Sequence, residues 1–407
     1  MTTADSAMES AAPATENRAT LASLGISVVR DDVAFRLQRR LGLIPANGLG
    51  IARRALFWSL FAWLPIAAWA VWNGSALANA AGEPLLAHFG IHARFLLAIP
   101  LLFIGEATVH GMSLRVLPQF VTTGLVPAEE VARLQQLVQR LARLRDAVLP
   151  WIAMLAIVVA VITVSQVLHR VHEVEWAEAP GPAPVPGFGG WWFLYVARPI
   201  FLTLMLAWLW RIVLLFLLFR GIARLKLSIV PTHPDRTGGL GFLARFPAAF
   251  APIVLALSAV TAAMLAHDVV YHGASVGSLK IQMAVFVLLV VLIFLLPMLA
   301  FVAPLARARR QALADYGALV GRHGRLVHRR WIEGKAVPEQ SLLDAPELGP
   351  IADVATLFDA VRAMRTVPLS KDAVMPLVLA AVVPMIVVFA IEVPIGQLLG
   401  QILKTLI

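Results

Sequence analysis

The sequence predicts an all-α protein, a polytopic transmembrane helical bundle of about seven spans with short amphipathic cytoplasmic helices. Composition is the first reason: of 407 residues, 59% are hydrophobic and only 14% are charged, with a mean hydropathy of +0.80. A soluble domain carries about a quarter charged residues. The second reason is that the apolar residues gather in runs of about 20, the length at which a helix crosses a bilayer.

Seven apolar runs are long enough to cross a membrane, and they lack the alternating pattern of a membrane β-barrel. We predict spans at 55–73, 94–113, 148–168, 192–219, 247–267, 281–303 and 373–391. The last of these contains Pro376 and Pro384, which remove backbone donors and bend helices. A final apolar piece, 395–407, is too short to assign as a span, so whether it re-enters the membrane is left open.

Lys and Arg are distributed unevenly between the loops. The segments 1–54, 114–147, 220–246 and 304–372 hold 28 of the 34 basic residues. Because cytoplasmic loops carry the excess of Lys and Arg, these segments and the N-terminus are predicted to be cytoplasmic. The net charge of +10 is then explained by contact with anionic lipid heads, and nucleic acid is not an expected partner. The preference for Arg over Lys is typical of GC-rich bacterial genomes, so the predicted location is the bacterial cytoplasmic (inner) membrane.

The predicted spans divide the chain into five segments. Residues 1–20 form a disordered tail and 21–54 a cytoplasmic pre-membrane segment; 55–303 form a six-span bundle that includes the cytoplasmic loops 114–147 and 220–246. Residues 304–372 form a cytoplasmic helical segment, and 373–407 contain the last span and a C-terminal interfacial piece. Amphipathic helices are predicted at 127–145, 307–330 and 350–365. They form either a cytoplasmic layer or a contact in a homo-oligomer.

Three ionisable residues lie well inside predicted spans, where charge is costly and indicates function by default, whereas Arg198 of the fourth span can reach the outer interface. Glu106 and His110 are spaced four residues apart on one helix, which suits a metal-ligand pair or a proton relay. Alternatively, both face a neighbouring helix. Arg211 lies in the fourth span, and we predict that it forms an intramembrane ion pair with Glu106.

The loop after the fourth span is the one motif-like string in the chain. It reads His-Pro-Asp-Arg-Thr-Gly-Gly-Leu-Gly-Phe-Leu from His233 to Leu243 and resembles a string of uncharacterised bacterial integral membrane proteins, a resemblance that implies no activity. Glycine-rich turns before a helix let backbone N–H groups approach an anion. The loop is therefore either an anion or metal site or a well-capped turn, and its candidate residues are His233, Asp235, Arg236, Gly238, Gly239 and Gly241.

Two groups of residues are candidates for a divalent metal, the one cofactor the sequence suggests. The chain has no cysteine, so the ligands must be His and carboxylates. The first group joins two residues of the second span to two of the loop: Glu106, His110, His233 and Asp235. The second is an outer cluster for metal binding or pH sensing, unless these are simply histidines tolerated at span ends. It contains His88, His92, His169, His172, His267 and His272, with the nearby acids Glu83, Glu173, Glu175, Glu178 and Asp268.

Three classes of function remain open at this stage. The buried charged residues favour a transporter or channel for a small solute or an ion. The metal-ligand candidates favour a membrane-embedded metal-dependent enzyme, although no established catalytic motif such as His-Glu-x-x-His is present. The amphipathic cytoplasmic helices and the outer histidines favour a membrane sensor or scaffold. No substrate can be named.

Overall fold

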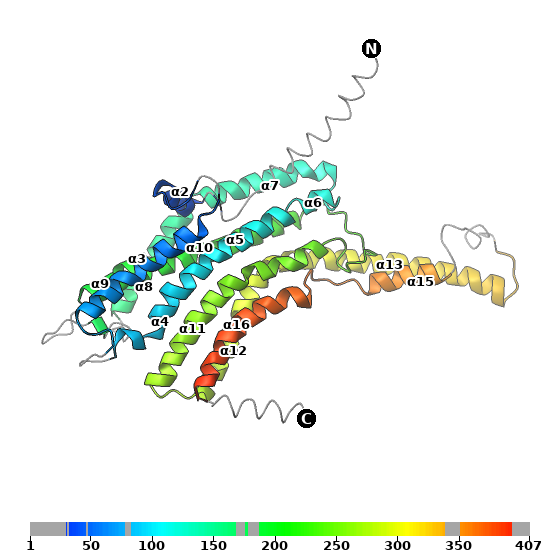
Figure 1. Cartoon of the computed structure of the whole chain (residues 1–407). Helices are drawn as coiled ribbons and strands as arrows, with labels where there is room; N and C mark the ends of the chain where they lie inside the picture. Colours follow the sequence, from blue (N-terminus) through cyan, green and yellow to red (C-terminus); the bar gives the residue numbers. More distant parts are fainter. Residues whose placement is uncertain are drawn as a thin grey trace, which may run out of the picture.

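The computed structural model describes residues 30, 32–45, 48–77, 83–167, 176–177, 187–337 and 351–392, which form helices and loops (Figure 1). Among these residues, seven helical segments are long and apolar enough to span a membrane: Ile51–Trp72, Phe89–Thr122, Ala128–Val164, Phe188–Ile222, Gly241–Tyr271, Val276–Ile332 and Lys371–Ile391. Each overlaps one predicted span, so the all-α membrane bundle is confirmed. The predicted tail 1–20 and the piece 395–407 lie outside the described residues.

Helix α11 (Ala251–Tyr271) lies in the middle of the bundle. It packs against α5 (Ile99–Val116) on one side and α16 (Lys371–Glu392) on the other, as the side-by-side ribbons show (Figure 1). Helices α3 (Ile51–Trp72) and α10 (Arg198–Ile222) complete the layer beyond α5. Helices α8 (Leu149–Val167) and α12 (Val276–Leu295) leave many apolar side chains exposed, which is the surface expected against lipid.

Small and hydroxyl-bearing residues bring α5, α11 and α16 close together, as is typical of membrane helix contacts. Gly105 of α5 faces the buried Ile253 of α11 without a side chain between them. The Ser258 hydroxyl of α11 donates to the Ala381 carbonyl of α16 at 2.5 Å. The Thr108 hydroxyl of α5 donates to the Ala249 carbonyl at 2.7 Å.

Two spans contain a π-helical turn directly before a proline. In the second span, α4 (Phe89–His92) continues through the π-turn Ala93–Ala98 into α5, whose second residue is Pro100. In the fourth span, α9 (Phe188–Trp192) and the π-turn Phe193–Ala197 precede α10, whose second residue is Pro199. Because proline lacks an N–H and clashes with the preceding turn of a helix, a widened turn accommodates it.

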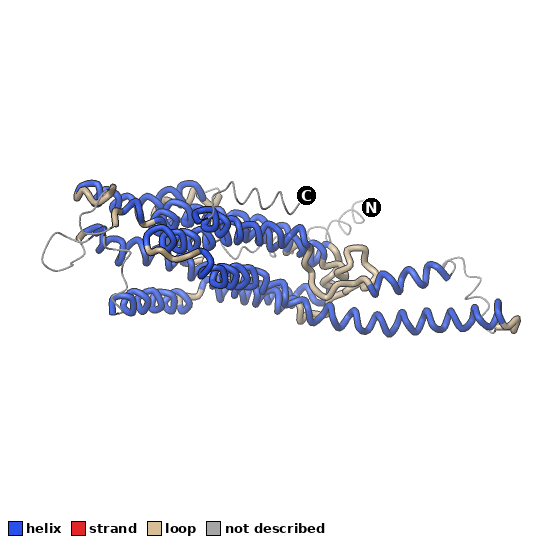
Figure 2. The backbone as a smooth tube through the Cα atoms, turned by 90° about the horizontal axis from the view of Figure 1, so that it is seen from below, coloured by secondary structure: helices blue, strands red, loops and turns tan. Residues whose placement is uncertain are grey.

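The two ends of the bundle differ in composition. The Arg-rich end carries α2 (Val33–Arg40), α7 (Ala128–Asp146), the loop 223–240, α13 (Val302–Val327) and α15 (Ile351–Arg362). The opposite, His-rich end carries residues 83–92 and 267–272. Helix α13 continues from the sixth span and projects with α15 well beyond the other helices (Figure 2). The helices predicted at 127–145, 307–330 and 350–365 are therefore confirmed.

An aromatic core lies between the spans and the loop at the Arg-rich end. Phe219 lies 5.5 Å from both Phe246 and Phe301, measured between ring centroids. Phe301 in turn stacks on Phe120 at 5.9 Å. All four rings are fully buried, so this core fixes the position of the 3₁₀ turn Gly241–Phe250 that leads from the loop into α11.

Candidate functional site

Four charged side chains form one buried network near the Arg-rich end. Arg211 of α10 contacts the Glu106 carboxylate of α5 at 2.7 Å and the Asp32 carboxylate at 2.8 Å. Arg54 of α3 contacts the second oxygen of Glu106 at 2.5 Å and donates from Nε to Gln38 of α2 at 2.6 Å. The two guanidinium groups and two carboxylates balance in charge, so the network as a whole is neutral.

The network is enclosed by aromatic rings and by the start of α2. The four charged side chains are at most 5% exposed. The Arg54 guanidinium lies 4.5 Å from the Phe103 ring centroid, which adds a cation–π attraction. Asp32 also caps α2, since its carboxylate accepts from the backbone N–H of Phe35 at 2.7 Å. Each residue therefore fastens one segment, and together they join α2, α3, α5 and α10.

The predicted ion pair between Glu106 and Arg211 is confirmed. The placement of Arg54 and Asp32 beside this pair could not be predicted from the sequence. Arg54 follows Arg53 at the start of a span, yet Arg53 is exposed and Arg54 is 1% exposed. Asp32 belongs to the short segment before the first span. Charge balance did not reveal them, because the predicted pair of Glu106 and Arg211 is already neutral without a second guanidinium group or carboxylate.

The loop at the Arg-rich end encloses a carboxylate of its own chain. The Asp235 oxygens accept from the backbone N–H groups of Thr237 at 2.7 Å, Gly241 at 2.8 Å and Gly239 at 3.1 Å. Nδ1 of His233 lies 2.9 Å from the same carboxylate. Gly238 and Gly239 have positive φ angles of 66° and 96°, which direct these N–H groups inward. The predicted cradle for an anion therefore exists, and Asp235 fills it.

The loop is fastened to the segment before α16 through Arg236. This residue is exposed and has φ at 56°, a left-handed conformation that a non-glycine residue rarely adopts. Its carbonyl accepts from the backbone N–H of Arg365 at 2.6 Å.

Burial of Asp235 alone would raise its pKa, but the hydrogen bonds from Thr237, Gly241 and Gly239 outweigh burial and lower the pKa below 3.8.

The four residues that were predicted to form a metal site near this loop do not come together as a group of ligands. Within the described part of the chain, Glu106, His110, His233 and Asp235 belong to no group of three or more potential ligands. The reason is that both carboxylates have other partners: Glu106 binds two guanidinium groups, and Asp235 binds backbone N–H groups. His110 is half-buried, one helical turn from Glu106 on α5.

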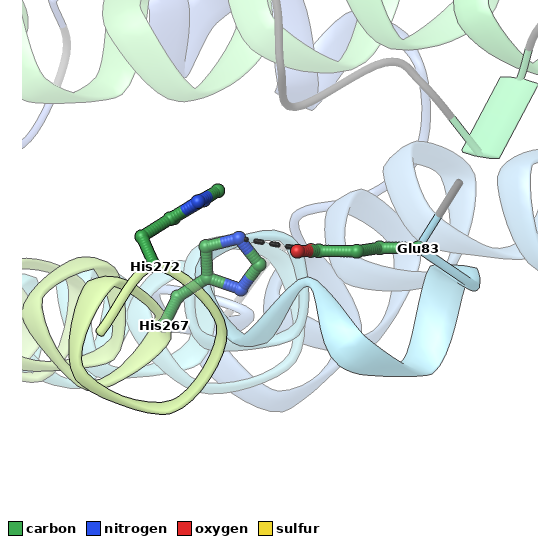
Figure 3. A group of neighbouring side chains, drawn as sticks. All are labelled: Glu83, His267 and His272. Carbon is green, nitrogen blue, oxygen red and sulfur yellow. Dashed lines mark ion pairs between the residues drawn. The ribbon is translucent and has the colours of Figure 1, made fainter.

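Three potential metal ligands meet at the His-rich end. Glu83 lies on the segment before the 3₁₀ turn Leu85–Ala87, His267 lies in the last turns of α11, and His272 follows that helix (Figure 3). One ligand atom from each lies within 4.8 Å of the others. Nε2 of His267 is 3.1 Å from Oε2 of Glu83. Two histidines and one carboxylate are a ligand set used by zinc sites that keep a fourth position open.

The hydrogen bonds around His267 orient its ring for a cation. Nδ1 lies 3.0 Å from the carbonyl oxygen of Ala87, and a carbonyl can only accept, so Nδ1 carries the proton. In the neutral ring, the Nε2 lone pair then points at Glu83. Oε2 of Glu83 is buried and accepts no hydrogen bond from the described residues. The lone pairs of Nε2 and Oε2 therefore face each other, which requires either a second proton on the ring or a metal ion between them. A carbonyl that accepts from Nδ1 is the usual orienting partner of a metal-binding histidine.

The other predicted outer histidines have different positions. His88 stacks on His267 with ring centroids 5.2 Å apart, so it packs against the three-residue group. His92 accepts from the Trp63 indole at 3.0 Å and donates to the Leu85 carbonyl at 3.1 Å, so both of its ring nitrogens are used in structure. His169 and His172 lie outside the described residues, as do the nearby acids Glu173, Glu175 and Glu178.

Comparisons with protein-family models, with curated proteins and with solved structures give no match for this chain. The functional conclusion therefore depends on the residues and their geometry.

Proposed function

We propose that this multi-pass membrane protein binds a divalent transition metal, with Zn²⁺ as the best fit, and acts as a metal sensor. The observation that carries the proposal is the meeting of Glu83, His267 and His272 within 4.8 Å, with the His267 proton fixed on Nδ1 by Ala87. Two ligands of a tetrahedral zinc ion with bonds of about 2.0–2.1 Å lie about 3.3 Å apart. The 3.1 Å between His267 and Glu83 is close to that separation. Because the ligand atoms of all three residues lie within 4.8 Å of one another, the exposed His272 side chain needs only a small movement to close the site.

The proposed orientation follows from the basic residues. Since cytoplasmic loops carry the excess of Lys and Arg, the Arg-rich end is assigned to the cytoplasm, in a bacterial inner membrane. The metal site then faces the outer compartment. Helix α11 supports a sensing role because it ends beside His272 and begins at the 3₁₀ turn that follows the Asp235 loop. One helix thus joins the metal site to the proposed cytoplasmic end.

Transport and catalysis remain the alternatives. The sequence favoured a small-solute or ion transporter because of buried charge, but Glu106 and Arg211 neutralise each other together with Arg54 and Asp32. Buried charge therefore no longer favours transport over sensing. An enzyme would use the open fourth position of the metal, although no nucleophile or acid beyond the ligands has been assigned to it.

Zinc binding by the purified full-length protein tests the proposal. Isothermal titration is expected to give one strong site per chain, weakened about tenfold or more in Glu83→Gln and in His272→Ala, because each removes a ligand. His328→Gln is the matched control: it removes an exposed histidine at the Arg-rich end and should leave the affinity unchanged. Equal affinities in all four proteins would overturn the proposed site.

A second assay separates sensing from transport. The protein is reconstituted in vesicles that contain a zinc-sensitive dye, and Zn²⁺ is added outside. A sensor binds zinc without raising the internal signal, whereas dye fluorescence that depends on Glu83 and His272 would establish zinc transport instead. Hydrogen exchange with and without Zn²⁺ then tests coupling, with altered exchange expected in the loop 231–241.

A further inference from the structure

A cleft of about 630 Å³ lies at the Arg-rich end, between the Asp235 loop and the start of α16. Its walls come from four places in the chain: the Asp235 loop, the turn Gly241–Phe250, the segment 365–373 that leads into α16, and Met112 of α5. The hydrogen bond from Arg365 N–H to the Arg236 carbonyl ties two of these walls together. The cleft is separate from both the buried charge network and the metal site.

The cleft has an apolar floor and a charged mouth. Met112 in the last turns of α5, Ala248 in the turn before α11 and Ala373 at the start of α16 supply the apolar surface. Arg245 and Arg365 are exposed and supply two guanidinium groups. The change from apolar to basic lining therefore coincides with the ends of the spans, where phospholipid headgroups are located.

The two guanidinium groups are not neutralised within the described part of the chain. Arg245 forms no ion pair there, and the guanidinium group of Arg365 donates only to the Leu369 carbonyl, at 3.5 Å. Two carboxylates also line the cleft. That of Asp235 is held by backbone N–H groups, and that of Asp372 lies in the first turn of α16, where the helix dipole stabilises negative charge. The four groups balance in formal charge, but Asp235 is directed at its own backbone N–H groups, so it does not pair with either guanidinium group.

We propose that this cleft binds the phosphate group of a phosphodiester, and that its source is an anionic phospholipid of the surrounding membrane. Guanidinium groups form charge-assisted pairs with phosphate oxygens, and basic pockets between membrane helices are known sites for lipid headgroups. Because neither guanidinium group forms an ion pair within the described residues, both are available for the single negative charge of a phosphodiester. The apolar floor favours a lipid over free phosphate, because it can contact the glycerol and the first acyl carbons.

Native mass spectrometry of the delipidated full-length protein tests this inference. Short-chain phosphatidylglycerol, short-chain phosphatidylcholine and inorganic phosphate are the three probes. Phosphatidylglycerol is expected to bind most tightly, and Arg245→Gln/Arg365→Gln should weaken it roughly tenfold or more, since both charge-assisted contacts to the phosphate are lost. Arg310→Gln/Arg325→Gln is the control, because it removes the same charge from exposed positions on α13.

An opposite-sign variant distinguishes binding from a structural effect. Asp372→Asn removes the negative charge at the mouth and should tighten phosphatidylglycerol several-fold, a gain that mere loosening of the protein would not produce. If phosphate binds as tightly as phosphatidylglycerol with the same dependence on Arg245 and Arg365, the site is upheld and its ligand is the free anion. Equal losses in the cleft and control double variants would overturn the site and indicate attraction by general charge.

Discussion

At the scale of single residues, the carboxylates of Glu106, Asp32 and Asp235 are held in two different ways. Glu106 and Asp32 are matched by two guanidinium groups contributed by other helices. Asp235 is matched by backbone N–H groups of its own loop. In both cases the charge is compensated before any ligand binds. The first role of these carboxylates is therefore to stabilise the fold. A binding site that needs a carboxylate without a partner has to be formed by other residues.

Removing two members of the buried network should destabilise the protein by less than the sum of the two single removals. Glu106→Gln leaves Arg54 and Arg211 buried with Asp32 alone, and the expected loss is about 3 kcal/mol or more in the free energy of unfolding in detergent micelles. Glu106→Gln/Arg211→Gln restores neutrality, so its loss should be smaller than the sum of the two single losses by at least about 1 kcal/mol. Glu129→Gln, at an exposed position on α7, is the control and should change little. Additive losses would contradict a shared network.

The Asp235 loop should weaken in acid. Because the folded-state pKa is lowered, the stabilisation is complete above the ordinary value of 3.8 and is lost as the pH falls through the lower folded value. Hydrogen-exchange protection of the Thr237, Gly239 and Gly241 amides should therefore hold at pH 6 and fall below about pH 4. Asp235→Asn should lower protection at pH 6 and remove the acid dependence. Asp359→Asn, an exposed change on α15, should behave like the wild type, and identical profiles for both variants would refute the role of Asp235.

At the scale of helices, the close approach of α5 to α11 depends on the absence of a side chain at Gly105. A Cβ atom there would overlap Ile253, which is fully buried on α11 and cannot move aside. The same helix contains Gly111, where an added Cβ meets nothing within 4 Å. The two glycines therefore have different roles within one element.

Alanine substitutions at these two glycines should have opposite effects. Gly105→Ala is expected to destabilise by about 1–3 kcal/mol through overpacking. Gly111→Ala is expected to be neutral or to stabilise by up to about 1 kcal/mol, because alanine favours the helix more than glycine does. Thermal unfolding of both variants in the same detergent measures the difference. Equal stabilities would show that α5 and α11 do not pack as closely as described.

The sequence predicted elements better than it predicted their contacts. The spans could be located because length and hydropathy suffice for a helix in lipid. The Glu106–Arg211 pair followed from charge balance alone. The placement of Asp32 and Arg54 could not be predicted in this way, since it depends on where α2 packs against the spans. For the glycine loop the sequence left open an anion or metal site or a well-capped turn, and the fold confirms the capped turn, in which Asp235 accepts the backbone N–H groups.

At the scale of the whole molecule, the two ends differ in chemistry and are joined by continuous helices. The His-rich end brings Glu83, His267 and His272 together, and the Arg-rich end carries the Asp235 loop, the phosphate cleft and the projecting α13 and α15. Helix α11 runs between them and packs on α5 and α16 along its length. A movement of α11 on metal binding would therefore reach the loop without passing through flexible segments.

The most direct measurement of the central claim is an experimental structure of the zinc-soaked protein with anomalous scattering at the zinc edge. The account predicts one strong peak about 2.0–2.2 Å from a Glu83 oxygen, from Nε2 of His267 and from a ring nitrogen of His272. The Nδ1 proton of His267 should still face Ala87. A structure without zinc at this position, with His267 and Glu83 in direct contact as an imidazolium–carboxylate pair, would contradict the metal site and leave the group as an ion pair.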